Sequence, residues 1–243
     1  MSGRTIRLSL LGPPGVGKGT YASNLAMQLH IPHISTGELL RREVKAGTSL
    51  GCEISLYVSR GLLVPDDIVN KILFERLAQP DCKQGFILDG YPRTISQALT
   101  LEERYPLDVA VLLHAPLEVV VERVSGRLYC PVCGKVYHER WKPPARRGYC
   151  DVCGTQLVRR EDDSEEIVRH RYEEYMKTIS PVVEFYKERE KLLFFDASRD
   201  ASIGIPILLE ELRSFLTHEE TAVISYDKLD LSLKKPLNPR EAF

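Results

Sequence analysis

The chain has 243 residues, of which 43% are hydrophobic and 28% charged, and its formal net charge at pH 7 is −1. This length is enough to bury a sizeable core and to form one compact domain with insertions. The balanced charge predicts no general attraction to nucleic acid or to an anionic membrane surface. No apolar run approaches the roughly 20 residues that are needed to span a bilayer.

The N-terminal sequence and the cysteines indicate in which cellular compartment the protein is expected. The first apolar run, Ile6–Gly12, is too short for a signal peptide and leads into a glycine-rich polar segment. Six cysteines in a chain without a secretory signal favour metal binding or free thiols over disulfides. We therefore expect an intracellular, cytoplasmic protein, and an organellar location is left open.

In chain order, short apolar runs alternate with amphipathic stretches. Four runs end at glycine, aspartate or proline, as expected for strands buried on both faces of a parallel sheet. These runs are Ile6–Leu11, Gly85–Leu88, Val109–Leu113 and Leu192–Phe195. The amphipathic stretches, which predict helices, are Lys18–Leu29, Asp66–Ala78, Leu117–Val124 and Glu165–Glu190. Val109–Leu113 and Phe194–Phe195 are also compatible with buried helix, but their short lengths and flanking breakers favour strands.

This βαβα order predicts an α/β fold with a doubly wound parallel sheet, in which ligands bind outside the carboxyl ends of the strands. Two segments break the order and are interpreted as insertions: residues 35–64, which look helical and polar, and residues 126–163, which hold four cysteines and three prolines. The remaining segments are residues 1–34, 65–125 and 164–217, which form the core, and residues 218–243, which form a C-terminal extension.

A phosphate-binding loop is predicted between the first strand and the first helix. Residues Gly12–Thr20 read Gly-Pro-Pro-Gly-Val-Gly-Lys-Gly-Thr and fit the pattern G-x-x-x-x-G-K. Its glycines let backbone N–H groups curl around a phosphate, the following helix presents its positive end, and Lys18 adds a mobile charge. Gly19 stands where the common pattern has Ser or Thr, so direct ligation of Mg²⁺ by Thr20 is left open. The alternative is a glycine-rich turn that binds nothing.

A second signal follows the apolar run Gly85–Leu88. This run ends at Asp89, which resembles the acidic residue that holds Mg²⁺ in P-loop enzymes. Arg93 comes four residues later, near the same edge of the sheet, where a guanidinium group can bind phosphate through two hydrogen bonds. The alternatives are an aspartate that caps a turn and an arginine exposed on the surface.

At these residues the sequence resembles the adenylate kinase family. Three segments look like its signature blocks: Leu10–Thr20, Ile34–Arg41 and Phe86–Arg93. A fourth, Asp162–Arg171, looks like another, and all four occur in the expected order over about residues 5–217. The resemblance implies a P-loop core, an AMP-binding insertion at 35–64 and a mobile lid at 126–163. It also implies reversible transfer of the γ-phosphoryl group of Mg·ATP to AMP, giving two ADP.

The resemblance also implies residue roles. Phosphate charge would be stabilised during transfer by Lys18, Arg93, Arg127, Arg160 and Arg171, and no general base is expected because the acceptor oxygen is already ionised. The residues implied for ATP are Gly15, Val16, Gly17, Lys18, Gly19, Thr20, Arg123, Arg127, Val136 and Tyr137. Those implied for AMP are Thr36, Arg41, Leu62, Leu63, Val64, Gly90, Tyr91, Pro92, Arg93, Gln97, Arg160 and Arg171. Mg²⁺ would be held by Asp89 through water. The family's Asp at position 38 is Glu38 here, from which we expect little effect.

A metal site is predicted inside the second insertion. Two C-x-x-C pairs, Cys130 with Cys133 and Cys150 with Cys153, are separated by 16 residues, and each pair is followed by glycine. This spacing is typical of a four-cysteine zinc site, and four thiolates leave no open position, so the zinc would be structural. Unrelated buried thiols or a disulfide are the alternatives. Some adenylate kinases carry such a zinc lid.

Several functional alternatives stay open. A zinc ribbon with arginine pairs at 146–147 and 159–160 could bind nucleic acid, although the chain is not basic overall. Related kinases phosphorylate UMP or CMP, but they generally have short lids, and Gln97 suits the edge of adenine. GTP remains possible as the donor. We expect a monomer, and we expect Cys52 and Cys82 to be free thiols.

Overall fold

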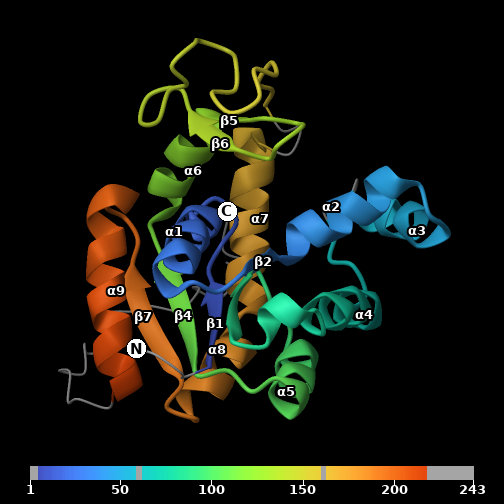
Figure 1. Cartoon of the computed structure of the whole chain (residues 1–243), viewed down its shortest axis with the longest axis vertical. Coiled ribbons are helices and arrows are strands. Elements are labelled where there is room, and N and C mark those ends of the chain that lie inside the picture. Colours follow the sequence, from blue (N-terminus) through green and yellow to red (C-terminus); the bar gives the residue numbers. More distant parts are fainter. Residues whose placement is uncertain (1–4, 59–61, 160–162, 218–243) are drawn as a thin grey trace, which may run out of the picture.

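The structure is a computed structural model that describes residues 5–58, 62–159 and 163–217 (Figure 1). Its centre is a five-stranded parallel sheet with the strand order β2-β3-β1-β4-β7. These strands are β1 (Ile6–Leu11), β2 (His33–Ser35), β3 (Gly85–Asp89), β4 (Val109–His114) and β7 (Leu192–Asp196). The expected α/β fold with a doubly wound parallel sheet is therefore confirmed.

Helices cover both faces of this sheet, and a two-stranded hairpin stands above it (Figure 1). The helices are α1 (Lys18–Leu29), α2 (Thr36–Ala46), α3 (Ser49–Val58), α4 (Asp66–Leu77), α5 (Ile95–Arg104), α6 (Leu117–Ser125), α7 (Glu165–Thr178), α8 (Ser180–Lys187) and α9 (Ala201–Thr217), with a 3-10 turn, η1 (Pro80–Cys82). The hairpin strands are β5 (Arg127–Tyr129) and β6 (Val136–His138), which pair antiparallel.

The strands are apolar throughout because each face of the sheet has its own core. In β1, Leu8 and Leu10 pack with helices α1, α6 and α9, whereas Leu11 packs with α4, α5 and α8. In β4, Val111 and Leu112 divide between the same two cores. Consecutive side chains of a strand point to opposite faces, so a strand covered on both sides has no polar side. Because all five strands run parallel, the loops after β1 and β3 meet at one edge.

The predicted elements differ from the structure in a few places. The helix expected over Glu165–Glu190 is wrong as one element, because α8 begins at Ser180 with Pro181 in its first turn. Proline lacks an N–H group and its ring clashes with the preceding turn, so the long helix is divided there. The strand assignments for Val109–Leu113 and Leu192–Phe195 are confirmed over buried helix. The sequence analysis did not assign β2, α5 and α9.

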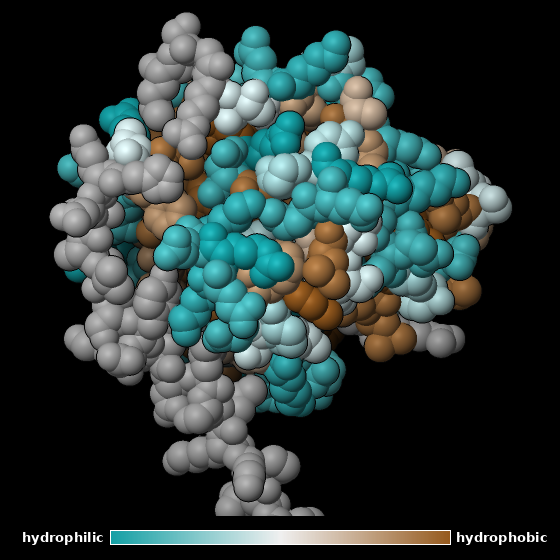
Figure 2. Space-filling view, turned by 90° about the horizontal axis from the view of Figure 1, so that it is seen from below, coloured by the Kyte–Doolittle hydropathy of each residue, from teal (hydrophilic) through white to brown (hydrophobic). Residues whose placement is uncertain are grey.

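Figure 2 shows the molecule from below, where a mainly hydrophilic surface carries small separate patches of hydrophobic residues. Scattered apolar residues of this kind are normal on a surface that faces water. Within the described ranges 5–58, 62–159 and 163–217, no helix has the length and apolar character that a membrane span requires.

We predict that Gly85→Ala destabilises the core. Gly85 has φ +121°, and a Cβ there would lie 2.0 Å from the carbonyl oxygen of Ile6 on the neighbouring strand β1. The backbone must shift, which should cost about 2–4 kcal/mol of unfolding free energy in urea titrations. Gly47→Ala is the control: it also has positive φ, but nothing lies within 4 Å of its Cβ. An equal loss in both variants would mean that backbone conformation, and not the close strand contact, sets the requirement.

Candidate active site and metal centre

The loop after β1 curls at the carboxyl edge of the sheet. Lys18 turns back over this loop, and its Nζ donates to the carbonyl oxygens of Gly12 at 2.7 Å and Pro13 at 2.9 Å. Gly15 has φ +86°, and a Cβ there would lie 2.4 Å from a methyl group of Val124. The glycine therefore lets the loop lie directly against α6, and the loop has the position and shape expected of a phosphate-binding loop.

Positive charge gathers around Lys18. Burial is the main reason why the pKa of Lys18 falls from 10.5 to about 8. The charge of Asp89 opposes this fall, and three arginines add to it: Arg93, Arg171 and Arg127. The structure thus brings together four of the five cations that were assigned to phosphoryl transfer. Arg160, the fifth, lies outside the described residues.

Asp89 ends β3 and faces the start of α1. Its Oδ2 lies 3.4 Å from Nε2 of His33, whose Nδ1 lies 3.3 Å from Oγ of Ser23. Burial would raise the pKa of Asp89, but the hydrogen bond of His33 and the charge of Lys18 outweigh it and lower the pKa. An ionised carboxylate only accepts hydrogen bonds, so Nε2 of His33 carries the proton. Such a carboxylate is suited to Mg²⁺ or its water ligands, and Thr20 is exposed in the first turn of α1.

Arg93 is fixed by the loop between β3 and α5. Its Nε donates to the carbonyl oxygen of Gly90 at 2.8 Å, and its backbone N–H donates to Oε1 of Gln97 at 2.8 Å. Burial lowers the pKa of Arg93 below its ordinary value, and the charge of Arg171 lowers it further. Gln97 is buried, and its Nε2 donates to Oδ1 of Asp66 at 2.6 Å. Its amide therefore retains one free N–H and one lone pair for a ligand.

The segment 35–64 contributes residues to the same edge. Thr36 is buried at the start of α2, and its hydroxyl donates to the carbonyl oxygens of Asp89 at 3.3 Å and Gly90 at 3.2 Å. Arg41, on the same helix, lies near enough to Arg93 for its charge to lower the pKa of that arginine. These contacts join α2 to the end of β3.

The remaining residues assigned to AMP differ in exposure. Leu62 and Leu63 are exposed, whereas Val64 is buried at the start of α4. Tyr91 and Pro92 are buried and joined by a cis peptide bond. The leucine side chains are therefore accessible from solvent, whereas Val64, Tyr91 and Pro92 are covered by the rest of the protein.

An ion pair joins the hairpin to the core. Arg127 on β5 donates from Nε to Oδ2 of Asp163 at 2.9 Å and also contacts Oδ1 through Nη2. Asp163 comes just before Ser164, the N-cap of α7, and Arg171 lies two turns into that helix. The structure thus places a cation on each side of the junction between the lid and the core.

Arg123, which was assigned to ATP, lies beside the phosphate loop. Its guanidinium group donates to three carbonyl oxygens, those of Val16 at 3.0 Å, Ser198 at 3.0 Å and Arg199 at 2.8 Å. These contacts tie the phosphate loop to the loop between β7 and α9. The structure therefore places Arg123 between the phosphate loop and the β7–α9 loop.

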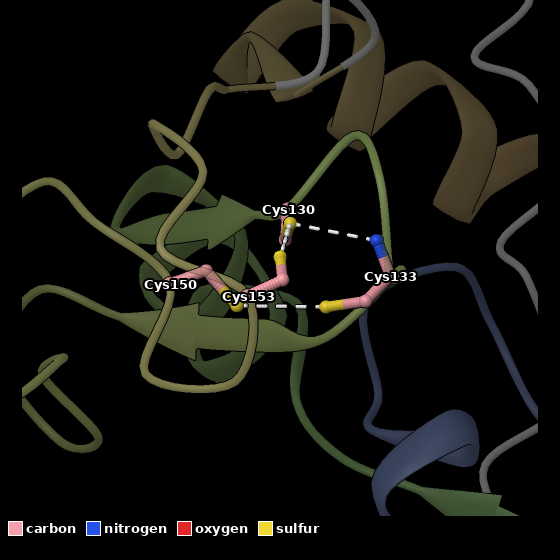
Figure 3. Close-up of side chains that lie close together, drawn as sticks. All are labelled: Cys130, Cys133, Cys150 and Cys153. Carbon is pink, nitrogen blue, oxygen red and sulfur yellow. Dashed lines mark hydrogen bonds between the residues drawn. The ribbon is translucent and has the colours of Figure 1, made fainter.

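The four lid cysteines converge on one point (Figure 3). All four Sγ atoms lie within 4.8 Å of one another, with 3.3 Å between Cys130 and Cys153 and 3.5 Å between Cys133 and Cys150. A tetrahedral zinc with Zn–S bonds of about 2.3 Å needs sulfurs about 3.8 Å apart, so the residues fit this metal.

The two halves of the cluster are built alike. The backbone N–H of Cys130 donates to the carbonyl oxygen of Lys135 at 2.9 Å. In the same way, the backbone N–H of Cys150 donates to the carbonyl oxygen of Thr155 at 2.8 Å. The glycine after each pair has positive φ, as the tight turn of a zinc knuckle requires. This repeated geometry supports the expected zinc site over four unrelated thiols.

Tyr137 and Val136 lie on opposite sides of β6. Val136 is partly exposed, whereas Tyr137 is buried in the small core of the lid. The hydroxyl of Tyr137 lies 3.4 Å from Sγ of Cys150 and accepts a hydrogen bond from the N–H of Asp151 at 2.8 Å. The ring of Tyr137 is therefore packed beside the cysteine cluster, and a nucleotide could contact this residue only through its backbone.

The family model for adenylate kinase matches residues 10–191 of the chain. The chain belongs to the adenylate kinase family. Among similar family members, the adenylate kinase of Thermosipho melanesiensis is 47% identical over 213 residues, which are 86% of this chain and 100% of that relative. The adenylate kinase of Pseudothermotoga lettingae is 48% identical over 200 residues, or 80% and 92% of the two chains. That of Clostridium perfringens is 41% identical over 199 residues, or 80% and 91%.

The structure of this family member also shows site residues that sequence reasoning missed. His33 and Asp66 orient Asp89 and Gln97, and Asp163 pairs with Arg127. Asp163 offered a signal, because it lies at the edge of the second insertion opposite an arginine at its start. His33 and Asp66 offered none, since their partners lie 56 and 31 residues away.

We predict that zinc is needed for the order of the lid and not for the fold of the core. The apolar core of the lid is a single small cluster of Cys130, Tyr137, Cys150, Leu157 and Leu128. Zinc binding supplies folding free energy in such modules. Elemental analysis should find about one zinc per chain in the wild type, and Cys130→Ser combined with Cys150→Ser should abolish it.

The same double variant should speed hydrogen exchange at the amides of residues 133–155 while the exchange of the central sheet stays slow. Loss of a few kcal/mol should lower the Tm by roughly 5–10 °C. Cys52→Ser, an exposed thiol outside the cluster, is the control and should change none of these. Wild-type protein without stoichiometric zinc under reducing conditions would contradict the prediction.

Proposed function

We propose that the chain catalyses reversible transfer of the γ-phosphoryl group of Mg·ATP to AMP, with ADP as both products. The observation that carries this proposal is the group of cations held at one sheet edge between the phosphate loop and the β3–α5 loop. Phosphoryl transfer needs little covalent help from the protein, and positioning and charge stabilisation supply most of the rate. Two polyanions could meet in this place because Lys18, Arg93, Arg127 and Arg171 offset their repulsion.

The donor side is assigned to the phosphate loop. The backbone N–H groups of residues 15–20 and Lys18 would hold the phosphates of ATP. Asp89 would hold Mg²⁺ through water, since Mg²⁺ keeps several of its water ligands in such sites. When bound, the ion neutralises charge that develops on the phosphates. Arg123 would contribute on the donor side by holding the phosphate loop to the loop that contains Ser198. We also propose that the donor is ATP and not GTP.

The acceptor side is assigned to the segment 35–64 and to the β3–α5 loop. Arg41 and Arg93 would bind the AMP phosphate. Leu62 and Leu63 are exposed where the base would lie, and Gln97 would read it with its remaining N–H and lone pair. Asp66 and the backbone N–H of Arg93 fix the orientation of that amide. We propose adenine as the base because a carboxamide can donate and accept along a purine edge, and because kinases that phosphorylate UMP or CMP generally lack a lid as long as residues 126–163.

The lid would close over the phosphates and exclude water. The residues 35–64 and 126–163 would move as two arms on the core, with the pair of Arg127 and Asp163 at the junction of the lid. Exclusion of water prevents hydrolysis of ATP and strengthens the charge interactions inside. Arg160 is proposed to join Arg127 on the closing side.

Other expectations are carried forward as proposals. The nucleic-acid alternative is disfavoured because the chain is not basic overall and the cysteine cluster lies in an insertion of a kinase core. A cytoplasmic location is proposed because a four-thiolate zinc site needs reduced cysteines. We also propose a monomer, which sedimentation at working concentration would test.

The test of the reaction is a coupled assay with ATP and GTP as donors and AMP, UMP and CMP as acceptors. The highest kcat/KM is expected with ATP and AMP, with two ADP formed per AMP consumed. A preference for UMP or CMP would contradict the proposed acceptor site. A preference for GTP would contradict only the proposed donor.

We predict that Arg93→Ala lowers kcat by on the order of 10³-fold, as for arginines that stabilise the transition state of phosphoryl transfer. The fold should survive, with a small change in Tm. Arg93→Lys should remain strongly impaired because an ammonium group cannot make two parallel hydrogen bonds. Arg213→Ala, an exposed arginine on α9, is the control and should leave kcat unchanged. A loss of only a few-fold for Arg93→Ala would remove Arg93 from the assigned role.

A further inference from the structure

One half-buried tyrosine on α7 has a buried hydroxyl group that is not explained by the contacts of the free protein. Tyr175 lies one turn after Arg171, so both side chains project from the same face of the helix. Its ring borders a narrow cavity of about 10 Å³ that is also lined by Pro13, Leu113 and Ile179. The ring is therefore packed between the phosphate loop, the end of β4 and the turn into α8.

The hydroxyl group of Tyr175 is buried, and it donates to no acceptor within the described part of the chain. Burial raises the pKa of Tyr175, and the backbone N–H of Gly12 and the charge of Arg93 oppose the rise only in part. The phenol is therefore protonated. The N–H of Gly12 faces its oxygen, and the charged groups nearby, Arg93 and Lys18, carry only donors. The hydroxyl hydrogen lacks an acceptor.

Two other tyrosine hydroxyls, those of Tyr21 and Tyr186, are also buried without a partner. Tyr186 lies in the core, where its nearest charges are those of Glu102 and Arg189. Tyr21 packs against α9, so that a Cβ at Gly204 would lie 2.2 Å from its oxygen. Tyr175 differs from both, because its oxygen lies beside the phosphate loop and within reach of the charge of Arg93.

We propose that Tyr175 is a substrate-contacting residue, whose hydroxyl donates a hydrogen bond to a phosphoryl oxygen held between the phosphate loop and Arg93. A phosphoryl oxygen is the acceptor that this donor-rich place lacks, and an O–H···O⁻ bond is among the stronger hydrogen bonds in proteins. The inference rests on the proposed function, since it needs a phosphate at this edge of the sheet. It adds a neutral donor to the four cations.

The test is Tyr175→Phe, which keeps the ring and removes only the hydroxyl. A hydrogen bond to a charged group predicts a loss of about 10- to 100-fold in affinity for an inhibitor that joins two adenosines through five phosphates. The kcat with ATP and AMP should fall by a similar factor. The Tm of the ligand-free protein should stay the same or rise, because an unpaired buried hydroxyl is removed.

The matched control is Tyr186→Phe, which removes an equally buried and unpaired hydroxyl far from the phosphate loop. It should leave kcat and inhibitor affinity unchanged. Unchanged affinity and kcat in Tyr175→Phe would overturn the inference, and so would a fall in activity that is accompanied by a lower ligand-free Tm, since that result means a structural role. Failure of the proposed function is separate, because the wild-type enzyme would then not form ADP from ATP and AMP.

Discussion

The constraint on which this structure depends is the burial of a lysine among other cations at one edge of the sheet. Arg93, Arg127 and Arg171 lie near enough to Lys18 to affect its pKa, and Asp89 opposes their effect. The pKa of Lys18 falls to about 8, mainly because the ammonium group is buried and in part because of these neighbouring charges. An unfolded lysine keeps its pKa near 10.5, so this group disfavours the folded state below pH 8, and the penalty fades as the pH rises toward 10.5. A bound polyphosphate would remove the same penalty at neutral pH.

The parallel sheet makes this crowding possible. Strands β1 and β3 end side by side, which puts Lys18 and Asp89 in contact range, while α7 and β5 bring two arginines from outside the first half of the chain. Backbone carbonyls hold the cations in place, as with Gly12 for Lys18 and Gly90 for Arg93. Arg123 instead donates its own hydrogen bonds to backbone carbonyls of two loops and joins those loops. The same residue type thus has two functions within one site.

The lid solves a different problem. Its segment is too small to build a core of usual size, and the four cysteines converge in geometry that fits zinc. A rigid lid can then carry Arg127 at one end while Asp163 anchors the other end beside α7. The residues that would stabilise the lid are therefore different from those that would bind phosphate, because no cysteine needs to contact the nucleotide.

Much of the fold could be predicted from sequence, and the reasons are specific. The apolar runs at β1, β3 and β4 are continuous because both faces are buried, and the loop Gly12–Thr20 is identified by its glycines and Lys18. The cysteine spacing alone predicted the convergence seen in Figure 3. The three residues of β2 were too few to give a periodic signal. The position of Arg123 could not be predicted, because its partners are backbone carbonyls, which have no sequence signature.

The pairings of His33 with Asp89 and of Gln97 with Asp66 were equally hidden, since they depend on how distant segments meet in space. Pro181 was visible in the sequence, yet the long amphipathic pattern around it outweighed the break that it causes between α7 and α8. Local chemistry therefore identified the phosphate loop and the metal centre. The orientation of each polar group within the site required the tertiary structure.

The most direct measurement is the pKa of Lys18 itself, followed by NMR of a ¹³C-labelled lysine side chain that is assigned with Lys18→Arg. In the free protein the account predicts a pKa near 8, well below the ordinary 10.5. Saturation with the two-adenosine pentaphosphate inhibitor should raise the pKa toward the ordinary value, because the phosphates bring negative charge beside the ammonium group. An ordinary pKa in the free protein, or no upward shift on binding, would contradict the claim that Lys18 is buried among cations at a site built for phosphate.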